Sequence, residues 1–323
     1  MFDALIAKLK AEPKTIVFTE GPDARILEAT SKLLAEGIMK VVLVGNVAEV
    51  EAAAKAGGFN IEGAEIVDPE TYAEMDAMVE KMVELRKGKM TPEQCKANLL
   101  KGNYFGTMLV KMGKAECLLG GATYSTADTV RPALQLIKTK PGNTIVSSCF
   151  IMVRDNADGT QDKLAMGDCA INSHPTEDNL VEIAQETAKC AQTFGIDPKV
   201  AFLSFSTKGS AKDDEVTKVQ NAVAKAKEVM TVPVDGEMQF DAAVAPEVGQ
   251  LKFPGSPVAG QANTFIFPDV TAGNIGYKIA ARLGGFAAYG PILLGLNAPI
   301  NDLSRGCNAD EVYKMAIITA GLA

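Results

Sequence analysis

A segment near the C-terminus combines an arginine with a hydroxyl group and a glycine. Residues 299–312 read PINDLSRGCNADEV and place Ser304 next to Arg305. A guanidinium is a permanently charged planar fork that suits phosphate or carboxylate, and a serine hydroxyl can donate or accept. A helix beginning after this pair would also present free N–H groups to an anion. The segment therefore predicts an anion site, although a capped helix with a surface arginine fits the same residues.

A second segment repeats this chemistry far away in the chain. Residues 120–132 read GGATYSTADTVRP and follow a short apolar strand pattern. Ser125 and Thr126 lie where a helix is expected to begin, and Arg131 lies further along it. Two hydroxyls, an arginine and a helix N-terminus indicate a second anion-binding group. The alternative is a capped helix with a solvated arginine.

A third segment places hydroxyls and a lysine after another buried strand. In SFSTKGSAK, residues 204–212, the side chains of Ser206, Thr207 and Lys208 could take a second phosphate group. Single charged residues at other strand or helix ends are more typical of the surface: Glu20, Arg25 and Arg86.

Composition excludes several classes of protein. The chain has 323 residues and a net charge of −8, so a bound anion must be held by a local cluster against the overall field. Nucleic acid is not expected as a partner, because the chain has no basic run and no tryptophan. No segment reaches membrane-spanning length and none resembles a secretory signal, which together predict a cytoplasmic protein.

The titratable residues also narrow the chemistry. The six cysteines contain no CxxC pair, so neither a disulfide frame nor a zinc site is expected. The single histidine, His174, precedes a capped helix and is interpreted as structural. The sequence has no GxGxxG after a strand, no GxxxxGK[ST], no HExxH and no GxSxG. A Rossmann dehydrogenase, a P-loop NTPase, a zincin and an α/β-hydrolase are therefore poorly supported.

Alternating strand and helix patterns must position these groups. Short β-branched runs alternate with amphipathic stretches, which is typical of α/β folds with parallel sheets covered on both faces. The turn KTKPGN at 138–143 is the expected crossing into a second domain, which begins with an antiparallel hairpin. We predict one domain of residues 1–141 plus 292–323 and another of residues 142–291.

Six longer segments resemble the phosphotransacetylases of the phosphate acetyl/butyryltransferase family. The resemblance covers essentially the whole chain. The segments are NYFGTMLV (103–110), TADTVRPALQLIKTKPG (126–142), LSFSTKGSAK (203–212), DGEMQFDAA (235–243), AGNIGYKIAARLG (272–284) and GPILLGLNAPINDLSRGCNADEV (290–312).

The resemblance implies two three-layer α/β/α domains, similar to isocitrate and isopropylmalate dehydrogenases, with the active site in the cleft between them. It also implies a homodimer that catalyses acetyl-CoA + phosphate ⇌ acetyl phosphate + CoA. No metal is expected, and no cofactor beyond the substrate coenzyme A. We expect CoA thiolate to attack acetyl phosphate directly in a ternary complex.

The resemblance also implies roles for individual residues. Ser304 and Arg305 match the serine and arginine of the family's SRGC, which orient the acyl carbonyl and hold phosphate. Arg131 matches the arginine of TVRP and is expected to hold the phosphoryl oxygens together with Arg305. Arg86 matches an arginine that is expected to contact the CoA phosphates. The family's base is an aspartate seven residues after the serine, where this chain has Glu311 instead.

The identity of the base remains open in the sequence. A carboxylate at Glu311 could form a capping box with Asn308, and the helix N-terminus would lower its pKa and weaken it as a base. Asp310 is the alternative. Because a thiol with a pKa of about 8.5 needs only modest help, an arginine beside the thiolate could also suffice without either carboxylate.

The sequence leaves three alternative functions open. A butyryl- or other acyltransferase would differ only in its pocket. A metal-dependent decarboxylating dehydrogenase on the same fold would need clustered aspartates and a nucleotide site, which the sequence does not show. A CoA-sensing regulatory module would bind acetyl-CoA without releasing thiol to phosphate.

Overall fold

The structure, a computed structural model, describes residues 2–323 and divides into two compact units. The first unit extends to Pro141 and resumes with Leu296–Ala323, and the second comprises Gly142–Gly295. The chain returns to the first unit at Leu296 rather than at the predicted residue 292, because strand β10 (Ala287–Leu294) continues through residue 292 in the second unit. Among residues 2–323, no helix is both long and apolar enough to cross a membrane.

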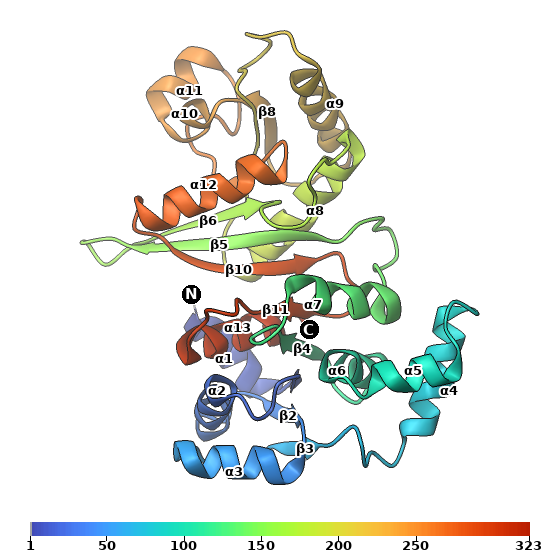
Figure 1. The fold of residues 1–323 in the computed structure, drawn as a ribbon. Coiled ribbons are helices and arrows are strands. Elements are labelled where there is room, and N and C mark those ends of the chain that lie inside the picture. Colours follow the sequence, from blue (N-terminus) through green and yellow to red (C-terminus); the bar gives the residue numbers. More distant parts are fainter. Residues whose placement is uncertain (1) are drawn as a thin grey trace. The chain divides into compact units, whose positions relative to one another are not determined.

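Parallel strands form the sheet of the first unit (Figure 1). Their order in the sheet is β11-β4-β1-β2-β3. The strands are β1 (Thr15–Phe18), β2 (Lys40–Val44), β3 (Glu65–Val67), β4 (Cys117–Gly120) and β11 (Ile300–Asp302). Most of their residues are buried, as expected for strands covered on both faces.

Helices cover both faces of this sheet. Helix α13 packs against α1 and α2, whereas α6 packs against β1, β2 and β4 from the other side. The helices are α1 (Phe2–Ala11), α2 (Ala24–Ala35), α3 (Val47–Gly57), α4 (Met75–Arg86), α5 (Pro92–Leu99), α6 (Gly102–Lys111), α7 (Thr126–Pro132), the π-helix η1 (Ala133–Ile137) and α13 (Ala309–Gly321).

The sheet of the second unit is mixed. Its order is β10-β5-β6-β9-β7-β8, and the pairs at β5 with β10 and with β6 are antiparallel. The predicted antiparallel hairpin is confirmed as β5–β6. Besides β10, the strands are β5 (Ser147–Asp155), β6 (Gln161–Gly167), β7 (Val200–Leu203), β8 (Val234–Met238) and β9 (Thr264–Ile266).

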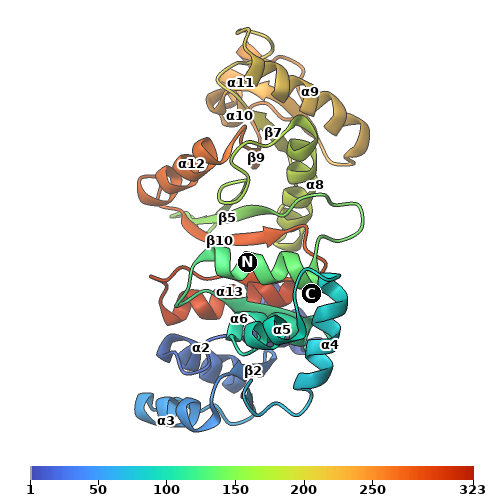
Figure 2. The same ribbon diagram turned by 45° about the vertical axis from the view of Figure 1, so that its right-hand side comes forward.

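Two hydrophobic clusters lie on the opposite faces of this second sheet. One includes Ile183 of α8 and Val219 of α9, and the other includes Phe265 and packs against Tyr277 of α12. Figure 2 shows α8 and α12 on opposite sides of the sheet. The helices are α8 (Glu177–Thr193), α9 (Asp214–Val229), α10 (Phe240–Val244), α11 (Pro246–Lys252) and α12 (Val270–Arg282). Each unit is thus a three-layer α/β/α domain.

Candidate active site

The carboxyl ends of β11, β4 and β1 lie side by side at one edge of the first sheet. The strands are parallel and adjacent, so the loops that follow them share this edge. From β1 the chain continues to β2 and β3 on one side, whereas β4 and β11 lie on the other side. Ligands of open α/β sheets bind at such a reversal of strand order. The loops are residues 19–23, 121–125 and 303–308.

Arg25 connects all three loops. Its Nε and Nη2 donate to the Asp23 carboxylate at 3.0 and 2.8 Å. Its Nη2 also donates to the Ala122 carbonyl at 2.9 Å, and its Nη1 donates to the carbonyls of Arg305 and Cys307 at 2.8 and 3.2 Å. The bonded guanidinium lowers the pKa of Asp23, so this carboxylate is ionised over a wider range of pH. Arg25 therefore contacts protein groups in each loop and is not the isolated surface charge that the sequence suggested.

The Glu20 carboxylate binds backbone N–H groups of the glycine-rich loop after β4. Its Oε1 accepts hydrogen bonds from the N–H groups of Gly121 and Thr123, both at 3.1 Å, and its Oε2 accepts one from the Thr19 hydroxyl at 2.7 Å. Burial raises the pKa of this carboxyl above its ordinary value, and these hydrogen bonds oppose the shift. An acidic side chain of the protein thus binds two backbone N–H groups of the loop that precedes α7.

Gly120, the last residue of β4, and Gly121, which follows it, are required by close packing against neighbouring protein groups. A Cβ built on Gly121 would lie 2.3 Å from the Asp302 carboxylate, and the φ of Gly121 is +100°. A Cβ on Gly120 would lie 2.1 Å from the Thr19 hydroxyl. Neighbouring protein groups therefore occupy the space that these glycines leave.

Asp302, the last residue of β11, joins that strand to α7. Its carboxylate accepts hydrogen bonds from the Thr126 hydroxyl at 2.6 Å and the Thr129 hydroxyl at 2.5 Å. Burial raises the pKa of Asp302, whose side chain is almost fully enclosed. The Thr126 hydroxyl, predicted to bind substrate, thus fixes the start of α7 instead.

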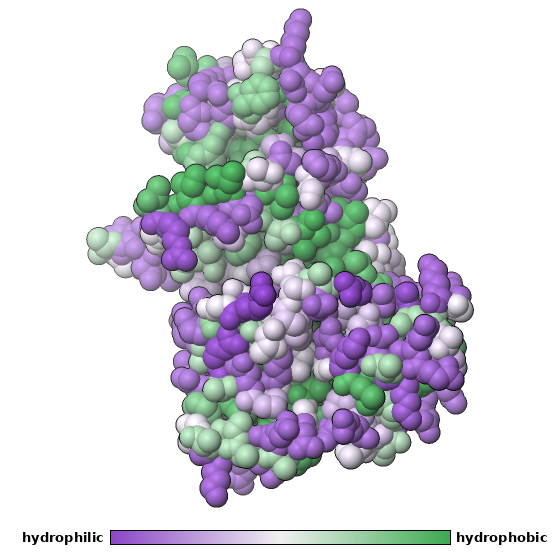
Figure 3. All heavy atoms as spheres, viewed as in Figure 1, coloured by the Kyte–Doolittle hydropathy of each residue, from purple (hydrophilic) through white to green (hydrophobic). Residues whose placement is uncertain are grey.

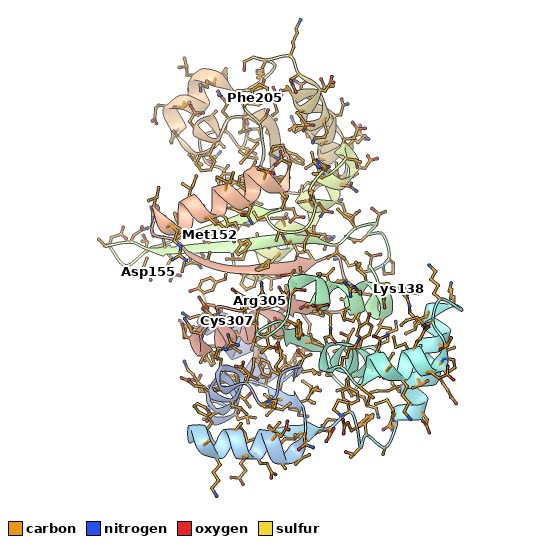
Figure 4. The ribbon with its side chains drawn as sticks, in the orientation of Figure 1. Lys138, Met152, Asp155, Phe205, Arg305 and Cys307 are labelled. Carbon is orange, nitrogen blue, oxygen red and sulfur yellow. The ribbon has the colours of Figure 1, made fainter. Side chains whose placement is uncertain are left out.

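Ser304 and Arg305 follow Asp302 after one residue and are exposed. Figure 4 labels Arg305 and Cys307 in the loop ahead of α13. Within this loop the Ser304 hydroxyl accepts a hydrogen bond from Gly306 N at 3.2 Å, and the Ser304 carbonyl accepts one from Cys307 N at 2.9 Å. The arginine side chain and the serine hydroxyl are thus accessible, while Arg25 binds the backbone carbonyls of the same loop.

The two candidate bases have different local partners at the start of α13. Glu311 forms the predicted capping box: its Oε2 accepts from Asn308 N at 3.0 Å, and its own N–H donates to the Asn308 side chain at 2.9 Å. Asp310 forms an ion pair with Lys314 at 2.6 Å. Glu311 therefore has an oriented carboxylate, whereas Asp310 lies in an exposed helical pair.

Ser125, Arg131 and Arg86 lie around α7 and the end of α4. The Ser125 hydroxyl donates to Asp128 at 2.7 Å, and Arg131 lies 3.8 Å from the same carboxylate. Arg131 has 59% of its side chain exposed. Burial raises the pKa of Tyr104, while the positive charges of Arg131 and Arg86 oppose this shift. The charges of both arginines therefore act on the Tyr104 phenol, as does the opposing charge of Asp128.

The predicted residues Ser206, Thr207 and Lys208 lie in the second unit, after β7. The Ser206 hydroxyl donates to buried Glu237 at 2.8 Å, and the Thr207 hydroxyl accepts from Gln239 N at 2.9 Å. Both residues are buried, whereas Lys208 is exposed with its Nζ 5.0 Å from the Phe253 ring centroid. The two hydroxyls organise their own loop, so of the three only Lys208 keeps an exposed polar side chain.

Sequence reasoning undervalued Arg25, Glu20 and Asp302, which hold the three loops together. Glu20 carried a signal, because it lies just after the buried strand β1, and Arg25 lies in the first turn of the helix that follows, but each was interpreted alone. Adjacency of β1, β4 and β11 could have identified them as one set, since residues at neighbouring carboxyl ends meet.

The fold and this edge define an α/β protein with exposed arginines at a topological switch point. The chain belongs to the phosphate acetyl/butaryl transferase family, which matches residues 1–320. A phosphate acetyltransferase of Bacillus subtilis (strain 168) is 52% identical over 324 residues, which cover 100% of this chain and 99% of the relative.

Solved structures show the same fold. A phosphotransacetylase from Streptococcus pyogenes is 51% identical, with a TM-score of 0.96 over 99% of this chain and 97% of the other. A EutD phosphotransacetylase from Staphylococcus aureus is 48% identical, with a TM-score of 0.92 and the same coverage. Membership of this family makes a metal-dependent dehydrogenase untenable as the function of the chain.

Proposed function

We propose that this protein is a phosphate acetyltransferase that interconverts acetyl-CoA and phosphate with acetyl phosphate and CoA. The observation that carries the proposal is the loop of residues 303–308, where Ser304 and Arg305 are exposed while Arg25 binds the backbone behind them. Permanent positive charge beside an accessible hydroxyl suits an acyl phosphate, which combines a polarised carbonyl with an anionic leaving group.

The reaction is a direct acyl exchange. CoA thiolate attacks the carbonyl carbon of acetyl phosphate, a C–S bond forms, and the C–O bond to phosphate breaks with its electron pair leaving on phosphate. The Arg305 guanidinium binds the phosphoryl oxygens, and the Ser304 hydroxyl donates to the carbonyl oxygen as negative charge develops there. Holding both substrates together removes the entropic cost of their encounter from the chemical step.

Glu311 is the proposed base for the thiol. One carboxylate oxygen, Oε2, is fixed by Asn308 N, which orients the group without changing the charge of the carboxylate. Asp310 is the second candidate, but its ion pair with Lys314 fixes it along the exposed helix surface. A thiol with a pKa of about 8.5 is already partly ionised near neutrality, so the demand on the base is small.

Arg86 and Arg131 are proposed to bind the phosphates of CoA, which for Arg131 replaces the contact with the phosphoryl oxygens expected from the sequence. Their charges act on the same side chain, Tyr104, which supports a shared positive region. Lys208 of the second unit remains a candidate for another phosphate, because its ammonium is exposed. The position of the reacting groups in a cleft between the two units stays a prediction from the family likeness, as does a cytoplasmic location.

A homodimer is also proposed, and the second copy would cover α12. Ile275, Ile279 and Leu283 follow helical spacing at its surface and are 54%, 53% and 86% exposed. Figure 3 shows the corresponding apolar band along α12. Apolar side chains arranged in one stripe favour association with a matching surface. Light scattering of the parent and of Ile279→Asp would test this, and a parent that stays monomeric would contradict it.

A thiol-release assay tests the function. The purified protein is given phosphate with acetyl-, propionyl- or butyryl-CoA, and free CoA thiol is measured. We expect phosphate-dependent release to be fastest with acetyl-CoA and unchanged after dialysis against a metal chelator. Preference for butyryl-CoA would identify a longer-chain acyltransferase. Binding of acetyl-CoA without thiol release would instead indicate a CoA-sensing module.

A further inference from the structure

We propose that Arg25 is a positioning residue that sets turnover by fixing the loop that carries Ser304 and Arg305. The inference rests on the proposed function, since it assigns the catalytic groups to that loop. Arg25 itself is the second residue of α2, 280 positions before Arg305 in the sequence, and reaches the loop only through the fold.

All the N–H groups of the Arg25 side chain have acceptors within the protein. An arginine has five N–H donors. Nε donates to Asp23 Oδ1, and the two N–H groups of Nη2 serve Asp23 Oδ2 and the Ala122 carbonyl. The two N–H groups of Nη1 serve the carbonyls of Arg305 and Cys307. No donor is left for a substrate, so Arg25 acts through the loops and not as a ligand.

The two ends of the loop are held without Arg25, because Leu303 N donates to the Gly120 carbonyl at 2.7 Å and Asn308 N donates to Glu311 Oε2 at 3.0 Å, but its middle has few other contacts. Between β11 and α13 its internal hydrogen bonds are those from Gly306 N and Cys307 N to Ser304, among the described residues. A Cβ at Gly306 would meet nothing closer than 3.8 Å, so the middle of the turn is loosely packed, while Leu303 and Cys307 on either side of it are buried. The carbonyl of Arg305 is therefore fixed mainly by Arg25.

The chemistry of the guanidinium makes the contact hard to replace. The fork holds Asp23 with two donors while its other edge points to two different loops, and 27% of its side chain is exposed. A lysine ammonium has a single nitrogen, so it cannot bind Asp23 and the carbonyls of both loops at the same time. Displacement of a catalytic group by about 1 Å can lower a rate by about 100-fold.

The experiment compares Arg25→Lys and Arg25→Ala with the parent and with Arg154→Lys. Arg154 is a matched control: it also binds one aspartate, Asp162, and one backbone carbonyl, that of Gly284, but it belongs to the second unit. Steady-state kinetics of acetyl transfer give kcat and the KM values for CoA and acetyl phosphate. Circular dichroism and thermal unfolding report the folded fraction.

We expect kcat of Arg25→Lys to fall by about 10- to 100-fold while the KM for CoA stays within about threefold. Guanidinium ion at low millimolar concentration should restore part of the kcat of Arg25→Ala, a rescue that general loss of stability would not show. Arg154→Lys should keep kcat within about twofold, because the partners described for it, Asp162, Gly284 and Phe286, all belong to the second unit.

Three results would overturn the proposal: an Arg25→Lys kcat within threefold of the parent, a loss that matches the unfolded fraction, or an equal loss in Arg154→Lys. An inactive parent would instead reject the proposed function.

If Arg25→Ala does not fold, alkylation of Cys307 in Arg25→Lys replaces the rescue test. Faster alkylation than in the parent, with Cys307→Ser as the blank, shows a loosened loop, and an unchanged rate rejects the proposal.

Discussion

Two loops of this protein have similar sequences and opposite structural roles. Residues 303–308 and residues 204–210 each follow a buried strand and combine hydroxyls with a cation. In the first loop Arg25 of helix α2 binds the backbone, and Ser304 and Arg305 stay exposed. In the second loop Ser206 and Thr207 are buried and bind the protein themselves. The Ser304 hydroxyl is therefore accessible, whereas the Ser206 and Thr207 hydroxyls are used to hold their own loop.

The largest expected effect is that of Arg305→Ala. If the exposed arginine stabilises the charge that develops on the phosphoryl group, kcat should fall by about 100-fold or more. The exposed side chain makes no hydrogen bond that holds the fold among the described contacts, so the unfolding temperature should stay near that of the parent. Steady-state kinetics and calorimetry measure both values. A kcat within threefold of the parent would remove the first loop from the active site.

Glu311→Gln should have the next largest effect. Glutamine keeps the capping interaction with Asn308 N but loses the charge, so the helix start is preserved. We expect kcat to fall by about tenfold, which is below the usual effect of a general base because a thiol ionises readily. Asp310→Asn is the matched control and should stay within about twofold. If Asp310→Asn lowered kcat more than Glu311→Gln does, Asp310 would be the base.

Arg131→Ala and Arg86→Ala test the positive region beside Tyr104. Removing a cation that binds a phosphate should raise the KM for CoA by about tenfold with a smaller change in the KM for acetyl phosphate. A pantetheine thiol, which lacks the nucleotide phosphates, should react equally with the variants and the parent. If the variants lost activity with pantetheine as well, these arginines would belong to the reacting centre instead.

Ser206→Ala distinguishes the second loop from the first. The hydroxyl donates to the buried carboxylate of Glu237, which would lose one partner and keep the hydrogen bond from Gly209 N at 2.7 Å. The free energy of unfolding should fall by about 1–3 kcal/mol. Turnover of the folded protein should stay within about twofold, and Lys208→Ala serves as the exposed comparison. A loss of kcat without a loss of stability would restore Ser206 as a substrate ligand.

The sequence predicted the fold class, the parallel strands of the first unit and the segments that end at their carboxyl edge. These features could be predicted because the motifs that resemble the family and the buried β-branched runs are short, continuous stretches of sequence. The roles of Glu20, Arg25 and Asp302 could not be predicted in the same way, since their partners lie about 100 to 280 positions away. Nor could the sequence decide between a hydroxyl that faces solvent and one that binds a buried acid, because Ser304 and Ser206 differ only in what surrounds them.

The smallest expected effect is a pH dependence of stability in the first unit. Burial raises the pKa of Glu20 in the folded protein above the ordinary value of 4.5. The folded state then binds more protons than the unfolded state between these two pKa values, so the free energy of unfolding falls as the pH rises through that window. Glu20→Gln, which keeps an oxygen for Gly121 N and Thr123 N, should remove this part of the decline. Chemical denaturation of parent and variant at a series of pH values gives the difference, which should slope by less than about 1.4 kcal/mol per pH unit. An opposite slope would mean that the hydrogen bonds to the carboxylate outweigh its burial.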